Sequence, residues 1–195
     1  MSWTPRLVGL CLCVGLTSGC IYSRHQTHTG RSATEQLLLT QSIERAVARL
    51  ELPEVDGRDV AVETVSLAPD EARYIQAELE ARLRQAGAHV VSPAEAEIVA
   101  VILVSASGTV ARELFFGVPP IPLPNGATLG IPFLRVLKQR GYTRLRLVAR
   151  DSTGAHVLES PPVMARGSFE VYAFLFLALR RNTIYPGEGF DIAID

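Results

Sequence analysis

Ile98-Val99-Ala100-Val101-Ile102-Leu103-Val104-Ser105 is the stretch that decides the fold. The run is almost wholly apolar and rich in β-branched residues, which is typical of a central strand buried on both faces of a sheet. A strand of this kind needs neighbouring strands at its edges and helices over the sheet. We therefore expect the flanking sequence to supply both.

Two amphipathic helices are predicted upstream of this strand. Ser32-Ala33-Thr34-Glu35 has the form of a capping box and begins a helix that runs to about Leu50. Ala68-Pro69-Asp70-Glu71 begins a second helix, which Gly87 ends. Apolar residues at helical spacing predict the buried face of each: Leu39, Ile43, Ala46, Val47 and Leu50 in the first, and Ala72, Ile75, Leu79, Leu83 and Ala86 in the second.

Further strands are predicted on either side of the apolar run. Residues 60–65 alternate and 89–91 form a short strand, whereas 142–150 and 156–158 form an antiparallel hairpin. Residues 171–179 carry signals for both a helix and a strand, and we favour a strand that completes the sheet. The tail from Asn182 is expected to be loop. The predicted fold is α/β (α+β), a mixed sheet of about five strands with two main helices packed on it.

The segment from 114 to 134 combines five prolines with many large apolar residues. Proline this dense disfavours a regular helix or a central strand. We expect a crossover laid over the sheet and largely buried. The alternative is an apolar lip that contacts a partner or a membrane surface. Its candidate contact residues are Phe115, Phe116, Ile121 and Leu123.

The first nineteen residues have the layout of a secretory signal peptide. A positively charged start, Met1 to Arg6, precedes an apolar run that ends in the small residues Thr17-Ser18-Gly19. The run is too short for a permanent transmembrane helix, which needs about 20 apolar residues. The predicted organisation is a cleaved leader over 1–19, a tether over 20–31 and one globular domain over 32–195.

Leu16-Thr17-Ser18-Gly19-Cys20 resembles the bacterial lipobox, the processing site of lipoproteins. The motif places Leu three residues before Cys, where this chain has Thr17, with Leu16 one residue further back. The resemblance implies cleavage between Gly19 and Cys20 and lipidation of Cys20. Two or three acyl chains would give durable membrane anchoring. An ordinary secreted protein with a chance cysteine is the alternative.

Composition bounds the classes of function. The 195 residues include 48% hydrophobic and 20% charged residues with a net charge of −1, which is typical of a globular protein and gives no basic surface for nucleic acid. All three cysteines, Cys11, Cys13 and Cys20, lie at the leader, so no intramolecular disulfide is expected in the mature chain. The four histidines do not have metal-ligand spacing, and neither a metal site nor a cofactor is predicted.

A second resemblance concerns the domain itself. The stretch from Tyr74 to Ser105 is similar to the amino-terminal domain of TolB and the periplasmic domains of CsgG- and FlgO-like lipoproteins. Residues 31–38, Phe-Gly-Val-Pro at 116–119 and the Asp-Ser-Thr-Gly turn also resemble an uncharacterised family of bacterial envelope lipoproteins. The first likeness implies a fold and the second names no activity, so neither supplies a catalytic residue.

No P-loop, nucleophile elbow or zinc-protease motif occurs in the sequence. Asp151, His156 and a nearby serine could be imagined as a triad, but a turn explains them better. We therefore expect a non-enzymatic, lipid-anchored envelope protein that binds a partner or assembles at the membrane, with a membrane-tethered periplasmic hydrolase as the alternative. Ile21 rather than Asp follows Cys20, which favours the outer membrane over the inner in a Gram-negative source.

Overall fold

The computed structural model describes residues 21–23, 31–122, 128–175, 177–184 and 191–194. Its packing divides the chain into two compact units. The α/β unit comprises residues 27–110 and 139–168, and the β unit comprises residues 1–26, 111–138 and 169–195. The boundaries predicted for the leader, the tether and the domain stay predictions.

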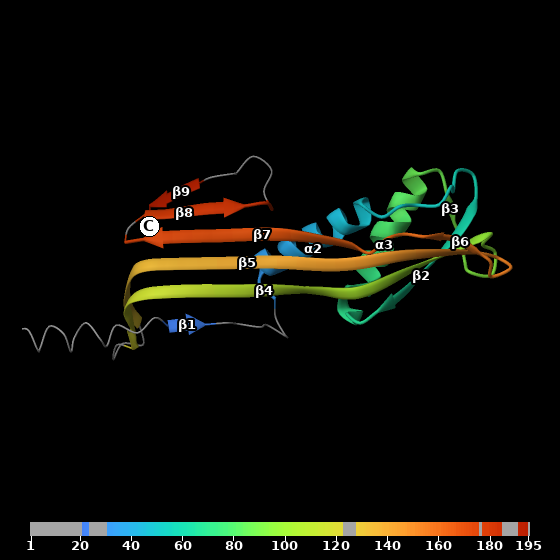
Figure 1. Ribbon diagram of the computed structural model, residues 1–195. Helices are drawn as coiled ribbons and strands as arrows, with labels where there is room; N and C mark the ends of the chain where they lie inside the picture. The colour runs from blue at the N-terminus through green and yellow to red at the C-terminus, as the bar shows by residue number, and fades with distance from the viewer. Residues whose placement is uncertain (1–20, 24–30, 123–127, 176, 185–190, 195) are drawn as a thin grey trace, which may run out of the picture. The chain divides into compact units, whose positions relative to one another are not determined.

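The sheet of the α/β unit has the strand order β3-β2-β4-β5-β7, and β6 pairs with β5 (Figure 1). The strands begin and end as follows: β2 Asp59–Ser66, β3 His89–Val90, β4 Ile98–Pro122, β5 Thr128–Asp151, β6 His156–Glu159 and β7 Val163–Phe174. Strands β2 and β4 are parallel, with a register from Val60 opposite Ile98 to Ser66 opposite Val104. The central position predicted for the apolar run is confirmed, because β4 lies between β2 and β5.

Both predicted helices are present, with the expected ends. Helix α2, Ala33–Ala48, begins with the capping box: Ser32 Oγ accepts from the Glu35 N–H, and the Glu35 carboxylate accepts from the Ser32 N–H. Helix α3, Pro69–Gln85, forms the crossover between β2 and β3, which pair in parallel. It ends at Gly87, whose φ of 89° is the left-handed conformation that glycine adopts freely.

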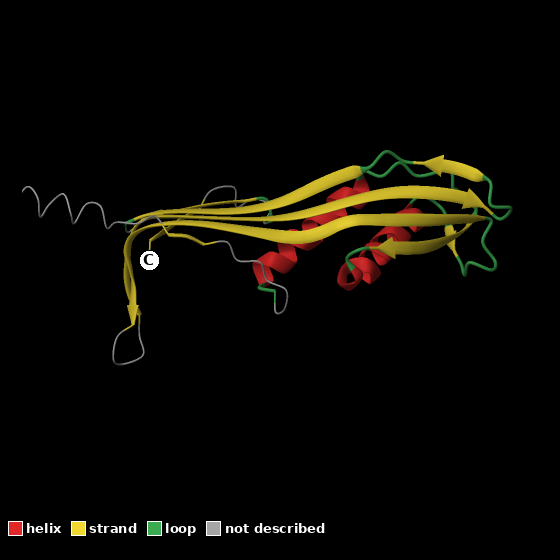
Figure 2. Cartoon of the chain, turned by 60° about the horizontal axis from the view of Figure 1, so that its bottom comes forward, coloured by secondary structure: helices red, strands yellow, loops and turns green. Residues whose placement is uncertain are grey.

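Figure 2 shows both helices on one face of the sheet. The hydrophobic core of the α/β unit is formed by side chains from these helices and from the strands. Every side chain predicted to face it from α2 is buried, and so are Ile75, Leu79 and Leu83 of α3. The prediction is wrong for Ala86, which is exposed because it follows the last turn of α3, and Ala72 is half-buried. The alternation predicted for β5 is also confirmed, since Leu145, Leu147 and Ala149 have no exposed surface. From β4 the core receives Ile98, Ala100, Ile102 and Val104.

Two glycines of the sheet let α2 approach closely. A Cβ atom built on Gly141 would lie 2.4 Å from the carbonyl oxygen of Leu38, and one built on Gly167 would lie 2.9 Å from the same atom. Beside this contact the buried hydroxyl oxygens of Ser42 and Thr143 are 2.7 Å apart. Helix α2 is therefore held against β5 and β7 by backbone proximity and a buried hydrogen bond.

The β5–β6 hairpin forms as predicted. Val148 lies opposite Glu159 and Ala149 opposite Leu158, and Gly154 in the connecting turn has a φ of 86°. Arg146 on the solvated face donates to Glu159 at 2.8 Å. Arg146 thus serves as a cross-strand partner within the hairpin.

The β unit has the strand order β4-β5-β7-β8-β9, with β1 paired to β4. Its remaining strands are β1 Ile21–Ser23, β8 Leu177–Asn182 and β9 Asp191–Ile194. None of its described side chains is fully buried, in contrast to those of the α/β unit. This unit therefore lacks a closed core among the residues that the structure describes.

The crossover predicted over 114–134 is wrong, because β4 continues to Pro122 and β5 begins at Thr128. Proline is compatible with a strand where no ladder partner needs its N–H group. The described pairing of β4 with β1 covers Glu113 to Phe115 and stops before the first proline of the segment, Pro119. The expected burial of the segment also fails, since Leu114, Phe116 and Phe133 are exposed.

Three smaller expectations need correction. Residues 171–179 are strand as favoured, but they belong to two strands, β7 and β8, joined by a turn at Leu175. Part of the tail, Asp191–Ile194, pairs with β8 instead of forming loop, and Ile21–Ser23 of the expected tether forms β1. The described residues contain nine strands instead of about five, because long-range pairing recruits short segments that carry little strand signal of their own.

Candidate functional site

The predicted lipidation site lies just outside the described residues, as do Gly19 and Leu123. Ile21, the residue after Cys20, begins β1. Strand β1 runs antiparallel to β4, with Ile21 opposite Phe115 and Ser23 opposite Glu113. The pairing therefore fixes where the chain that follows Cys20 meets the β unit.

Of the four candidate contact residues, Phe116 shows the clearest exposure. Its side chain is 40% exposed, and its ring centroid lies 6.2 Å from that of Phe133, which is itself 42% exposed. Phe115 is half-buried, and Ile121 lies within β4. The structure thus brings Phe116 together with Phe133, a residue from the neighbouring strand that the sequence did not single out.

The β7–β8 hairpin adds further exposed apolar side chains. Cross-strand register places Phe174 opposite Leu177 and Tyr172 opposite Leu179, and directly opposed residues of an antiparallel pair share a face. The Leu175 N–H in the hairpin turn donates to the Phe133 carbonyl at 3.2 Å, so Leu175 lies opposite Phe133. Phe174, the preceding residue, therefore faces the other side of the sheet from Phe133. We define the apolar surface of the β unit as its exposed residues Phe116, Phe133, Phe174, Leu175, Leu177 and Leu179. The Phe116–Phe133 pair lies on one face of the sheet, and Phe174, Leu177 and Leu179 lie on the other.

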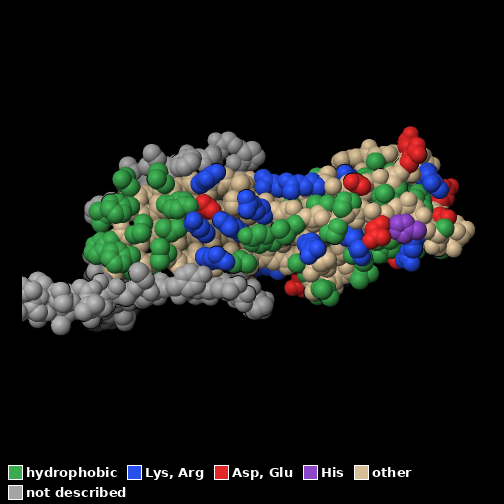
Figure 3. Space-filling model, viewed as in Figure 1, with side chains coloured by type: hydrophobic (Ala, Val, Ile, Leu, Met, Phe, Trp, Pro, Cys, Tyr) green, Lys and Arg blue, Asp and Glu red, His purple; other side chains and the backbone are tan. Residues whose placement is uncertain are grey.

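Hydrophobic side chains gather on the β unit in Figure 3, with Lys and Arg side chains next to them. Lys138 places its ammonium 5.4 Å from the ring centroid of Tyr172, and Arg181 lies opposite Glu170 in the hairpin. The Tyr172 hydroxyl donates to Glu170 at 2.8 Å. The apolar surface therefore has a charged border in which basic groups outnumber acidic ones.

Sequence reasoning missed Phe133, Phe174, Leu177 and Leu179 as surface residues. The signal was present for the hairpin, because Tyr172, Phe174 and Phe176 alternate. That alternation predicts a strand that completes the sheet but does not say which of its faces meets solvent. A pattern of alternating apolar residues does not distinguish a face that packs on a core from one that meets solvent.

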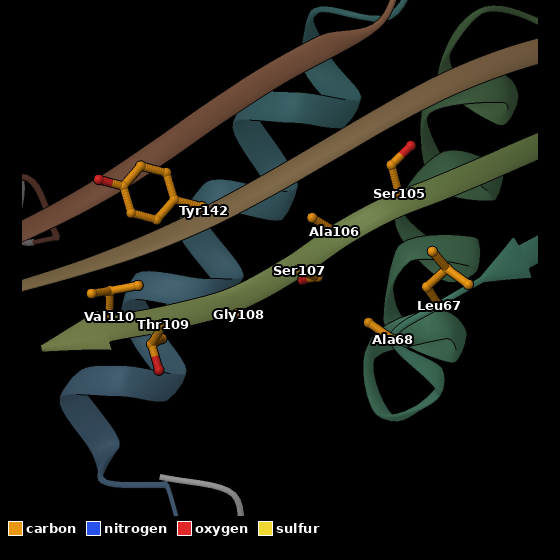
Figure 4. Close-up of a pocket in the computed structure, with 9 residues that line it drawn as sticks. All are labelled: Leu67, Ala68, Ser105, Ala106, Ser107, Gly108, Thr109, Val110 and Tyr142. Carbon is orange, nitrogen blue, oxygen red and sulfur yellow. The ribbon is translucent and has the colours of Figure 1, made fainter. Parts of the chain in front are cut away.

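A pocket of about 290 Å³ lies in the α/β unit, where β2 leads into α3 (Figure 4). Leu67 and Ala68 line one side, and Tyr142 of β5 contributes its ring. The rest of the lining is a run of β4, Ser105 to Val110. Its lining includes the hydroxyl groups of Ser105, Ser107, Thr109 and Tyr142 but neither histidine nor a carboxylate.

The residues imagined as a triad serve the β5–β6 hairpin. The Asp151 carboxylate accepts from Thr153 and from the Ala155 N–H, and these hydrogen bonds hold the pKa of Asp151 below its ordinary value. The His156 Nε2 lies 3.5 Å from Glu159, and both side chains are exposed. These contacts are those of a hairpin turn, as the sequence favours.

Among the described residues, no helix has both the length and the apolar character needed to cross a bilayer. The same residues contain no group of three or more histidine, cysteine, aspartate or glutamate side chains that could hold a metal ion. No protein-family model matches the chain, and no curated protein matches it. The resemblance to envelope lipoproteins therefore stays a prediction from the sequence.

Proposed function

We propose that this protein is a lipid-anchored lipoprotein of the bacterial cell envelope, non-enzymatic, with a binding or assembly role. The observation that carries the proposal is the apolar surface of the β unit. Its side chains are 40% to 59% exposed. Large apolar side chains that a fold leaves exposed together mark a site of interaction with a protein or a membrane.

The anchor half of the proposal rests on the sequence. The leader over 1–19 and the lipobox-like residues to Cys20 support export, cleavage and acylation of Cys20, with the mature chain facing the periplasm. Ile21 after the cysteine favours the outer membrane in a Gram-negative source. Ile21 belongs to the β unit, so an anchor on Cys20 would attach to the same unit that carries the apolar surface. This supports a connection between the proposed anchor and the proposed binding role.

Acylation can be tested by labelling bacteria that express the full chain with radioactive palmitate. The wild-type protein is expected to take up label and to sediment with membranes, and Cys20→Ser is expected to lose both properties. Cys13→Ser is the matched control, because it removes a cysteine from the apolar leader and leaves the acylated position intact. Equal labelling of wild type and Cys20→Ser would refute the anchor.

The binding role can be tested with a photo-crosslinking phenylalanine analogue in cells. At Phe116 the analogue is expected to give an adduct with another envelope molecule, protein or phospholipid, because this ring is exposed within an apolar surface. Val157 of β6 is the control, since it is similarly exposed, at 43%, but belongs to the α/β unit. Adducts at neither position, or equally at both, would contradict a binding role for the surface.

A further inference from the structure

We propose that Arg45 and Arg49 of helix α2 keep the outer edge of strand β7 from pairing with a second copy of this chain. We call this edge, residues 163–168, the β7 edge. The inference concerns the α/β unit alone and depends neither on the lipid anchor nor on the apolar surface of the β unit. It makes the β7 edge a strand-pairing surface that two arginine side chains hold closed.

The first step concerns the β7 edge itself. Strand β7 lies between β5 and β8, but its pairing with β8 covers only Phe169 to Phe174. From Val163 to Ser168, no strand of the described chain pairs with the outer side of β7. The backbone groups that point to this side therefore have no ladder partner. An unpaired strand edge is a template for pairing with another chain unless the fold covers it.

The second step concerns the two arginines. The Arg45 Nη1 donates to the carbonyl of Arg166 at 2.9 Å, and the Arg49 Nη1 donates to the carbonyl of Met164 at 3.4 Å. Arg45 and Arg49 are four residues apart, so they lie on the same side of α2. Met164 and Arg166 are two residues apart, so their carbonyls point to the same side of β7. The two guanidinium groups thus take the place of the donors that a neighbouring strand would supply.

The third step concerns what brings the arginines within reach. Gly167 of β7 admits the backbone of α2, because a Cβ atom there would lie 2.9 Å from the Leu38 carbonyl oxygen. Ala46 and Val47, which follow Arg45 in the helix, are buried in the core. The two arginine contacts are themselves exposed to solvent. The core therefore holds α2 in place, and the arginines extend from it over the β7 edge.

The fourth step concerns the occupant. A strand edge can pair with the same edge of a second copy about a twofold axis, the commonest symmetry of homo-oligomers. Antiparallel pairing centred on Ala165 would place Met164 of one copy opposite Arg166 of the other, so no like charges would face each other directly. The same register places Val163 opposite Gly167, which has no side chain to obstruct the contact. The β7 edge is thus complementary to itself, which favours a second copy over an unrelated peptide.

The test follows sedimentation and amide hydrogen exchange of the full chain in detergent over a range of protein concentrations. Arg45→Ala/Arg49→Ala removes both side-chain donors. Arg73→Ala/Arg84→Ala is the matched control, because it removes two arginines and the same charge from α3. The double variant at 45 and 49 is expected to dimerise, and its amides over 163–168 should exchange at least about tenfold more slowly as the concentration rises. Wild type and control should show exchange over 163–168 that does not depend on concentration.

Adding Arg166→Pro to the double variant should return both measurements to the wild-type values. Proline removes the outward N–H that an incoming strand needs, and it is tolerated at a strand edge. Arg45→Ala alone, with a smaller expected slowing of exchange, keeps the test valid if the double variant folds poorly. Concentration-independent exchange over 163–168 in the folded variants would overturn the inference, and so would a dimer that persists with Arg166→Pro. Neither result bears on the lipid anchor or on the apolar surface, since exchange is read at the β7 edge alone.

Discussion

The close approach of helix α2 to strand β5 depends on Gly141. The carbonyl oxygen of Leu38 occupies the space where any Cβ atom at this position would lie. The atom in conflict belongs to the backbone of a buried helix, so it cannot move aside as a flexible side chain could. The neighbouring hydrogen bond between Ser42 and Thr143 has the same geometric origin, because it forms only when α2 lies this close to β5.

Gly141→Ala is therefore expected to lower the free energy of unfolding by about 1–3 kcal/mol, the usual cost of overpacking. Gly108→Ala is the matched control, since a Cβ atom there meets nothing within 4 Å, and its change should stay within about 0.5 kcal/mol. Urea unfolding followed by circular dichroism measures both. An equal loss in the two variants would show that strand propensity and not helix proximity sets the cost.

Helix α2 shows how local sequence specifies an element. Its capping box and apolar stripe are both legible in the chain and both present in the structure. The strands differ in this respect. The hairpin of β5 and β6 follows from alternation and turn residues, whereas the continuation of β4 past Phe115 and the short strands β1 and β9 depend on partners distant in sequence.

Ser32→Ala is expected to lower the free energy of unfolding by about 1 kcal/mol, because the Glu35 N–H loses its side-chain acceptor. Ser32→Asp should restore most of that loss, since an aspartate oxygen caps equally well and carries a charge that the helix amino terminus favours. Thermal or urea unfolding of the two variants provides the measurement. Failure of the aspartate variant to recover stability would mean that Ser32 acts by contacts other than the cap.

The two units differ in how they pack their apolar side chains. The α/β unit buries its apolar side chains against two helices, whereas the described side chains of the β unit remain partly or largely exposed. Apolar surface that the fold leaves in water is unfavourable by roughly 25 cal/mol per Å², so an external partner that covers it gains that free energy. This imbalance connects the architecture with the proposed binding role.

The sequence by itself determined the mixed α/β class, both helices with their ends, the central strand and the β5–β6 hairpin. Each of these is encoded by periodicity, capping or turn chemistry within a short window. It also contains the lipobox-like motif at Cys20, on which the proposed localisation in the cell envelope depends.

Only the tertiary structure decided that β4 extends to Pro122 and that β5 begins at Thr128. It also decided that Gly141 and Gly167 admit a helix, and that Phe133 is exposed beside Phe116 while Leu177 is exposed on the other face of the sheet. The physical reason is common to all three. Strand pairing, close backbone approach and side-chain exposure are settled by residues far apart in the chain, and an apolar residue has the same local pattern whether its face meets a core or solvent.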